Sequence, residues 1–135
     1  MKKIAILLCI MGSLLGISAC SIQKTSTEKL HDLEFTVVEE KEVPEELMKM
    51  IEEKKTQSMK MTFADRGMLY IVEGYGTLQT SGYSIEVKEC YESENAIYFQ
   101  SNLIGPSESE KAVEGESYPY IVIKMEYIDK HVVFQ

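Results

Sequence analysis

Few residues of this 135-residue chain have the types and spacing that catalysis needs. The two histidines, His31 and His131, lie in a polar N-terminal stretch and near the C-terminus. No zinc-protease, nucleophile-elbow, phosphate-loop or dinucleotide motif occurs in the sequence. Cys90 would need a neighbouring base to act as a thiolate, whereas its neighbours Glu89 and Tyr91 would raise its pKa. We therefore interpret Cys90 as an unreactive thiol on one sheet face.

Methionines and carboxylates are numerous enough to suggest metal or acid–base sites. Met59 and Met61 alternate with polar residues as on a strand, so core packing explains them better than a metal–thioether site. Most glutamates lie in charge runs or turns, although inspection does not exclude a paired-carboxylate site. The acidic loop 107–117 lacks the spacing of a calcium loop and is interpreted as solvated surface. We predict a non-enzyme that needs no metal and no cofactor.

The N-terminus does point to a covalent modification. Lys2 and Lys3 precede an apolar run over 4–17, which predicts a secretory signal peptide (1–19) too short to span a membrane. The Ile-Ser-Ala-Cys sequence ending at Cys20 resembles a bacterial lipobox. That resemblance implies that Cys20 becomes the mature N-terminus and carries a diacylglycerol, with the protein anchored on the extracytoplasmic side of the cell membrane. The alternative is an ordinary secretory signal in which this cysteine is incidental.

The net charge restricts the possible binding partners, and the number of cysteines restricts the possible disulfide bonds. Removal of Lys2 and Lys3 with the signal leaves 12 basic against 22 acidic residues, a net charge of −10. Such an acidic protein lacks the basic patches that bind phosphate backbones, so we exclude nucleic acid as a partner. An anionic membrane surface would also tend to repel it. Cys90 is the one cysteine left after the anchor, so no intrachain disulfide is possible.

Composition and periodicity divide the chain into a signal peptide, a flexible lipid-anchored linker (20–32) and one β-rich domain (33–135). Pro44 and the glutamates after it predict a helix over 44–57, with Leu47 and Ile51 on its apolar face. Period-two patterns and apolar runs predict six to seven strands, among the segments 33–38, 59–63, 68–72, 83–92, 96–104, 121–125 and 131–134. We expect a mainly β fold (α+β at the margin), either a small antiparallel β-sandwich or a partly open barrel, with one packed helix.

Two details of these strands can be checked directly. Strict alternation over 83–92 places Ile85 and Val87 on one face and Cys90 on the other. In 33–38 the same rule places Phe35 and Val37 together on one face. The Tyr118–Pro119 bond is a candidate cis peptide, for which we predict the trans form.

The stretch 74–85 combines glycines, hydroxyl groups and tyrosines between two predicted strands, where recognition loops commonly lie. Its exposed part is predicted to contact a partner, through Tyr75, Thr77, Gln79, Thr80 and Ser81. Other residues of similar type are interpreted as markers of the fold, namely Gly82, Tyr83, Tyr118, Pro119 and Tyr120. For the five predicted contact residues, a purely structural role is an equally good explanation.

A family resemblance rests on these same residues. Thr80, Gly82 and Tyr83 follow an apolar strand, and a Tyr-Pro-Tyr-Ile-Val-Ile strand occurs later, over 118–123. This pattern resembles the PrcB C-terminal domain family over roughly 68–134, although Ser81 stands where family members usually have glycine. The resemblance implies a non-catalytic, secreted or lipid-anchored accessory protein of bacteria that binds or stabilises a protease.

Two alternative functions remain open. The Thr-x-Gly-Tyr loop is also similar to loops of chagasin-like cysteine protease inhibitors, but the Arg-Pro loop of that group is missing. The other alternative is a structural envelope lipoprotein without a dedicated protein partner.

Overall fold

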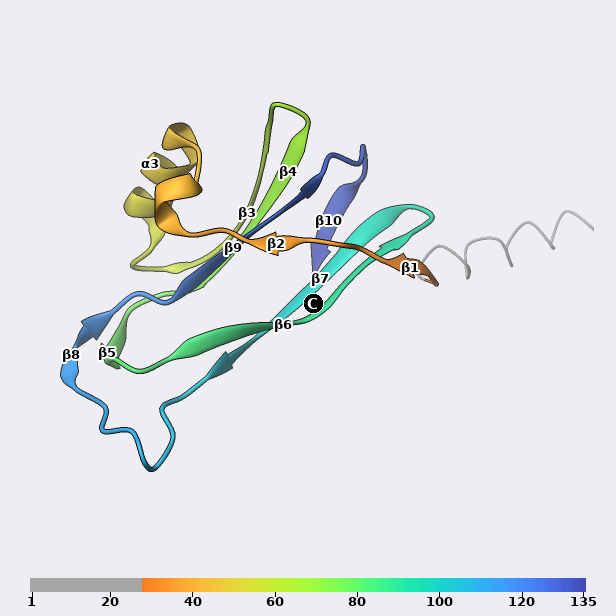
Figure 1. Cartoon of the computed structure of the whole chain (residues 1–135). Helices are drawn as coiled ribbons and strands as arrows, with labels where there is room; N and C mark the ends of the chain where they lie inside the picture. Colours follow the sequence, from red (N-terminus) through yellow and green to blue (C-terminus); the bar gives the residue numbers. More distant parts are fainter. Residues whose placement is uncertain (1–27) are drawn as a thin grey trace, which may run out of the picture.

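The structure is a computed structural model that describes residues 28–135 (Figure 1). The predicted signal peptide and Cys20 lie outside the described residues. Two four-stranded sheets pack face to face, one in the order β1-β6-β7-β10 and the other in the order β2-β9-β4-β3, and β5 pairs separately with β8. The strands are β1 (Lys29–Asp32), β2 (Thr36–Val37), β3 (Ser58–Asp65), β4 (Met68–Tyr75), β5 (Leu78–Thr80), β6 (Ser84–Ser93), β7 (Ala96–Ile104), β8 (Glu114–Ser117), β9 (Tyr120–Glu126) and β10 (His131–Phe134). This confirms the prediction of a mainly β sandwich, and the sheets do not close into a barrel.

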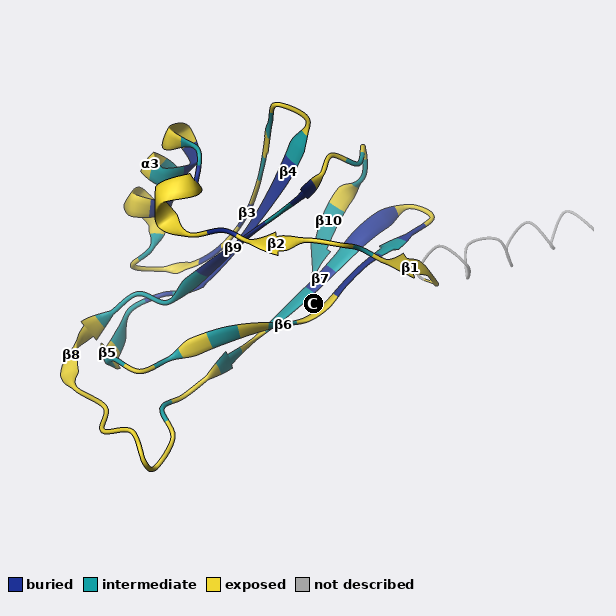
Figure 2. Cartoon of the chain, in the orientation of Figure 1, coloured by how far each residue is buried: buried dark blue, intermediate teal, exposed yellow. Residues whose placement is uncertain are grey.

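The core lies on both faces of the β4–β9 pair, and Figure 2 shows these strands as the most buried. On one face, Leu69 and Ile71 of β4 pack with β6, β7 and β9 residues between the two sheets. On the other face, Tyr70 and Val72 pack with the helix α3 (Glu45–Lys54). The molecule therefore has three layers, and the apolar run 68–72 is buried on both sides as its sequence predicts.

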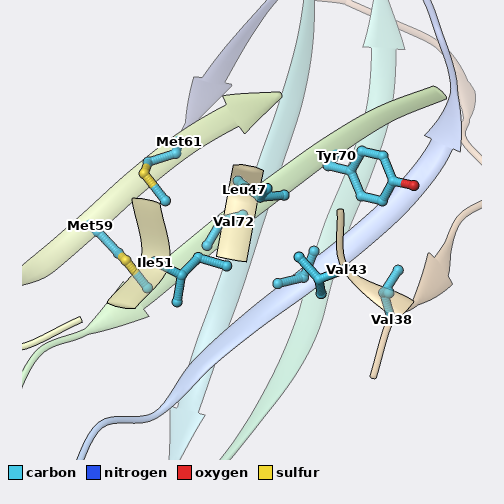
Figure 3. Packing of buried hydrophobic residues seen from close by; sticks show 9 residues of the cluster. Val38, Val43, Leu47, Ile51, Met59, Met61, Tyr70 and Val72 are labelled. Atoms are coloured by element: carbon cyan, nitrogen blue, oxygen red, sulfur yellow. The ribbon is translucent and has the colours of Figure 1, made fainter. Parts of the chain in front are cut away.

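Helix α3 covers the outer face of this sheet through one apolar stripe. Leu47 and Ile51, four residues apart, are completely buried against β3 and β4 (Figure 3). The helix begins at Glu45, directly after its N-cap residue Pro44, and ends at Lys54. It is therefore shorter than the predicted 44–57. At this end the backbone N–H of Gln57 donates to the Lys54 carbonyl at 3.0 Å, three residues back, and the Thr56 carbonyl accepts from the backbone N–H of Thr77.

The β3–β4 hairpin follows the predicted pattern closely. Arg66 and Gly67 have φ values of 50° and 78°, so a two-residue turn of left-handed residues joins the strands. Asp65 pairs with Met68, and the ladder continues without interruption to Ser58 opposite Tyr75. A regular register keeps Met59 and Met61 on the face that packs with the helix, and their predicted role in core packing is confirmed.

A β-bulge overturns the face predicted for Cys90. The pairing of β6 with β7 shifts between Val87 and Glu89, which inserts one extra residue into β6. Side chains beyond the bulge consequently exchange faces, so Cys90 joins Ile85 and Val87 in the core between the sheets. Strict alternation along the whole strand was therefore the wrong assumption.

The remaining differences between the predicted and the observed strands arise where a segment pairs with a strand that is distant in the sequence. Lys29–Asp32, predicted within the flexible linker, forms β1 against β6, and the strand predicted at 33–38 is reduced to Thr36–Val37. The end of the predicted acidic loop forms β8 against β5, and β10 pairs in parallel with β7. Phe35 and Val37 are exposed rather than forming a core face. Within residues 28–135, no helix is both long and apolar enough to cross a membrane.

The three-layer packing predicts a large cost for truncating the helix stripe. Leu47→Ala should lower the free energy of unfolding by about 3 kcal/mol, because it opens a cavity where the side chain is completely buried. Lys49→Ala, an exposed position on the same helix, should change it by less than about 0.5 kcal/mol. Urea unfolding followed by circular dichroism measures both variants. Equal effects would show that α3 does not pack on the sheet as described.

Candidate partner-binding site

The predicted partner-contact residues lie mostly in a two-stranded projection, which we call the flap (residues 77–81 and 113–117). Leu78 pairs with Ser117 and Thr80 with Glu114, and the backbone N–H of Ser81 donates to the Val113 carbonyl at 3.0 Å. In Figure 1 the flap extends from the sandwich at the end remote from β1. The sequence singled out the stretch that contains β5 but predicted neither β5 nor β8 as a strand.

Two glycines fix where the flap leaves the sandwich. Gly76 has a φ of +77°, and a Cβ there would lie 3.3 Å from backbone atoms of Gln57 and Ser58. Gly82 has a φ of +95°, and a Cβ there would lie 3.0 Å from the Pro106 side chain. Both positions combine a left-handed backbone with close contact, which glycine alone accommodates without strain. Between these glycines Gln79 is exposed, whereas Thr77 is half-buried and its Oγ1 donates to the Thr56 carbonyl at 3.1 Å.

Tyr75 differs from the other predicted contact residues because its hydroxyl is directed into the protein. The Ser101 hydroxyl donates to Oε1 of Glu73 at 2.5 Å, and the Tyr75 hydroxyl lies 2.5 Å from Ser101 Oγ. Since Ser101 has one hydroxyl proton, Tyr75 must donate to Ser101, which gives the chain Tyr75 to Ser101 to Glu73. Burial raises the pKa of the Tyr75 phenol, and the Glu73 charge adds to this rise. Tyr75 thus has an internal partner between the sheets.

Glu73 was absent from the sequence-based candidates. It is 6% exposed, and no ion pair involves it among residues 28–135. A charged residue following the apolar run 68–72 was the available signal, but only the second sheet places Ser101 opposite it. A buried carboxylate needs such a donor, so Ser101 compensates part of the cost of burying Glu73.

The Tyr118–Pro119–Tyr120 stretch joins the flap to the sandwich. Its peptide bonds are trans, as predicted, and the Pro119 carbonyl accepts from the Tyr75 backbone N–H at 3.0 Å. Lys55 Nζ lies 5.2 Å from the Tyr118 ring centre. The Tyr120 hydroxyl donates to Glu40 at 2.9 Å, and burial together with the Glu40 carboxylate raises its pKa strongly. Tyr83, the remaining fold marker, is half-buried, and its ring passes 3.7 Å from where a Cβ of Gly105 would lie.

The candidate nucleophile, Cys90, is buried, whereas His31 contacts a carboxylate. Cys90 is 5% exposed, and burial, with Asp32 adding to it, raises the pKa of its thiol to about 11. The direction agrees with the sequence-based expectation, but the cause is burial rather than its neighbours in sequence. His31 lies 3.2 Å from Glu92, which Lys130 also contacts at 2.6 Å. Residues 28–135 contain no group of three potential metal ligands.

The Tyr75–Ser101–Glu73 chain predicts unequal effects of two conservative substitutions. Ser101→Ala leaves the Glu73 carboxylate without its donor and should lower the free energy of unfolding by about 1–3 kcal/mol. Tyr75→Phe removes a hydroxyl at the end of the chain and should cost about 1 kcal/mol or less. Denaturant unfolding at pH 7 compares them, with Ser107→Ala as an exposed control. A larger loss for Tyr75→Phe than for Ser101→Ala would contradict this assignment.

Comparison with known proteins gives one match. The family model described as PrcB C-terminal matches residues 69–126, from β4 through β9, and this region includes both strands of the flap and the Glu73–Ser101 pair. No significant match occurs among curated proteins or among solved structures. Residues 69–126 are therefore similar to the PrcB C-terminal family, which supports the resemblance seen in the sequence.

Proposed function

We propose that this protein is a non-catalytic, lipid-anchored accessory subunit that binds and stabilises an extracytoplasmic protease. The family match over residues 69–126 carries the proposal, because the family is one of accessory domains of protease complexes. The lipobox-like sequence at Cys20 supports the anchor. The buried thiol of Cys90 and its raised pKa support a role other than catalysis.

The flap is the surface that we assign to the partner. It lies within the matched region and presents Gln79, Glu114 and Glu116 to solvent. Val113 at its border is 66% exposed, although its backbone is tied to Ser81. An exposed apolar side chain on a hydrogen-bonded support can bury its surface against a partner with little loss of conformational freedom. Interfaces of this kind place apolar contacts inside a polar rim, and the surrounding glutamates would form that rim.

Partner capture tests the flap directly. A Gln79→Arg/Val113→Asp double variant should capture about tenfold less protease activity from an envelope extract than the unmodified domain does. The reason is that it places charges in the proposed contact surface. Val37→Asp is the matched control, since Val37 is 57% exposed and lies on β2 outside the flap. Zymography of the captured material measures the difference. Equal recovery by the double variant, with an unchanged circular dichroism spectrum, would remove the flap from the interface.

The anchor is tested separately. Cys20→Ala should transfer the protein from the membrane fraction to the soluble extracytoplasmic fraction, because the thioether to the lipid can no longer form. Fractionation and immunoblotting of producing cells measure the distribution, with Cys90→Ala as the control that leaves the anchor intact. Retention of the Cys20→Ala protein on membranes would refute lipidation at this residue.

A further inference from the structure

Strand β3 forms a long open edge of its sheet. The sheet order places β3 at one end, and within residues 28–135 its outer side pairs with no other strand. The other edge strands are short: β2 has two residues, β10 has four, and β1 has four with a break in its register. By contrast, β3 has eight residues, contains no proline and pairs with β4 without a bulge. Long and regular edges of this kind are templates for pairing with a further strand.

The hairpin turn determines which backbone groups of β3 face outward. In a hairpin with a two-residue turn, the flanking residues, here Asp65 and Met68, exchange both of their backbone hydrogen bonds. The pattern alternates along an antiparallel ladder, so the N–H and C=O groups of every even-numbered residue of β3 point away from β4. No backbone group within residues 28–135 bonds to them on that side. The residues concerned are Ser58, Lys60, Thr62 and Ala64.

The two faces of this edge differ in chemistry. Met59 and Met61 are buried on the helix side (Figure 3), and Phe63 is half-buried there. The four even-numbered side chains lie on the opposite face and are all exposed. Among the described residues, the core between the sheets includes none from β3, so the second sheet does not cover this strand. An added strand would therefore meet apolar side chains on one face and small or polar ones on the other.

A second copy of β3 supplies a matching backbone edge. In an antiparallel pair, the outward backbone groups join only in registers that place even-numbered residues opposite one another. The register that uses all four of them places Ser58 of each copy opposite Ala64 of the other, and Lys60 opposite Thr62. A shift that places Lys60 opposite Lys60 is disfavoured, because like charges directly opposite one another are destabilising.

The same register matches the side chains of the helix face. It places Met59 of each copy opposite Phe63 of the other and brings the two Met61 side chains together. The apolar row beneath the helix then continues from one copy into the next. Cross-strand apolar pairs of this kind stabilise a sheet.

Charges at the two ends of β3 are complementary between copies. The hollow at the turn end is lined by four carboxylates and one guanidinium, those of Glu42, Glu45, Glu46, Asp65 and Arg66. The hollow at the other end is lined by one carboxylate and two ammonium groups, those of Glu53, Lys54 and Lys60. None of these carboxylates forms an ion pair within residues 28–135. Antiparallel pairing brings the acidic end of each copy beside the basic end of the other.

We propose that two copies of this protein associate through β3, in an antiparallel pair that joins their β2-β9-β4-β3 sheets into one continuous sheet. The two-fold axis passes between the Met61 residues, and both α3 helices lie on the same face of the joined sheet. The net negative charge of the chain opposes association, so the pairing depends on contacts specific to this register. The inference is independent of the proposed function, because β3 lies outside residues 69–126 and the pairing needs no anchor.

Charge substitutions at the exposed Thr62 test the register, in the chain 20–135 carrying Cys20→Ser. Thr62→Lys places a second lysine opposite Lys60, whereas Thr62→Glu places a carboxylate there. We expect sedimentation equilibrium to show a reversible dimer whose dissociation constant rises at least about threefold for Thr62→Lys and falls at least about threefold for Thr62→Glu. Overall charge predicts the opposite order, because Thr62→Glu makes an acidic protein more acidic. That opposite order, equal dissociation constants, or the absence of a dimer up to about 1 mM protein would overturn the proposal.

Cross-linking locates the contact on the strand. Thr62→Cys and Ala64→Cys, in the same Cys20→Ser chain, place a thiol on the same exposed face of β3. The two copies of residue 62 are diagonal neighbours about 8 Å apart in the proposed register, whereas the two copies of residue 64 are about 20 Å apart. A short bismaleimide that spans only the first distance should give at least about tenfold more covalent dimer with Thr62→Cys, measured by denaturing electrophoresis. The Cys20→Ser parent reports any reaction at the buried Cys90. Comparable cross-linking at both positions, or none with Thr62→Cys, would contradict the assigned contact.

Discussion

The fold depends on the burial of both faces of β4. Successive side chains of a strand point in opposite directions, so Leu69 and Ile71 enter one hydrophobic core while Tyr70 and Val72 enter the other. Neither layer can therefore shift against β4 without exposing apolar surface. The regular registers of β3 and β9 on its two sides follow from the same constraint, since a slip of one residue would exchange the two faces.

Near the end of β4, a charged residue occupies a position that faces the other sheet. Glu73 continues the inward alternation but is charged, and the structure accommodates it through Ser101, which in turn accepts from Tyr75. The strand then leaves the sandwich through Gly76, and the flap begins. A polar connection between the sheets thus lies beside the base of the projection that we assign to the partner. The base of the flap is fixed by hydrogen bonds and close backbone contacts, whereas Gln79 and Val113 face solvent.

The sequence by itself determined the elements whose patterns are local. Period-two alternation identified β3 and the apolar run identified β4, because the direction of a side chain on a strand depends on its neighbours in sequence. Tertiary structure decided what depends on a distant strand: the bulge that turned Cys90 into the core, the pairing of β8 with β5, and the parallel addition of β10. It also decided that Tyr75 is directed towards Ser101 rather than towards a partner. Such features arise from contacts between residues far apart in the chain, and no local pattern encodes them.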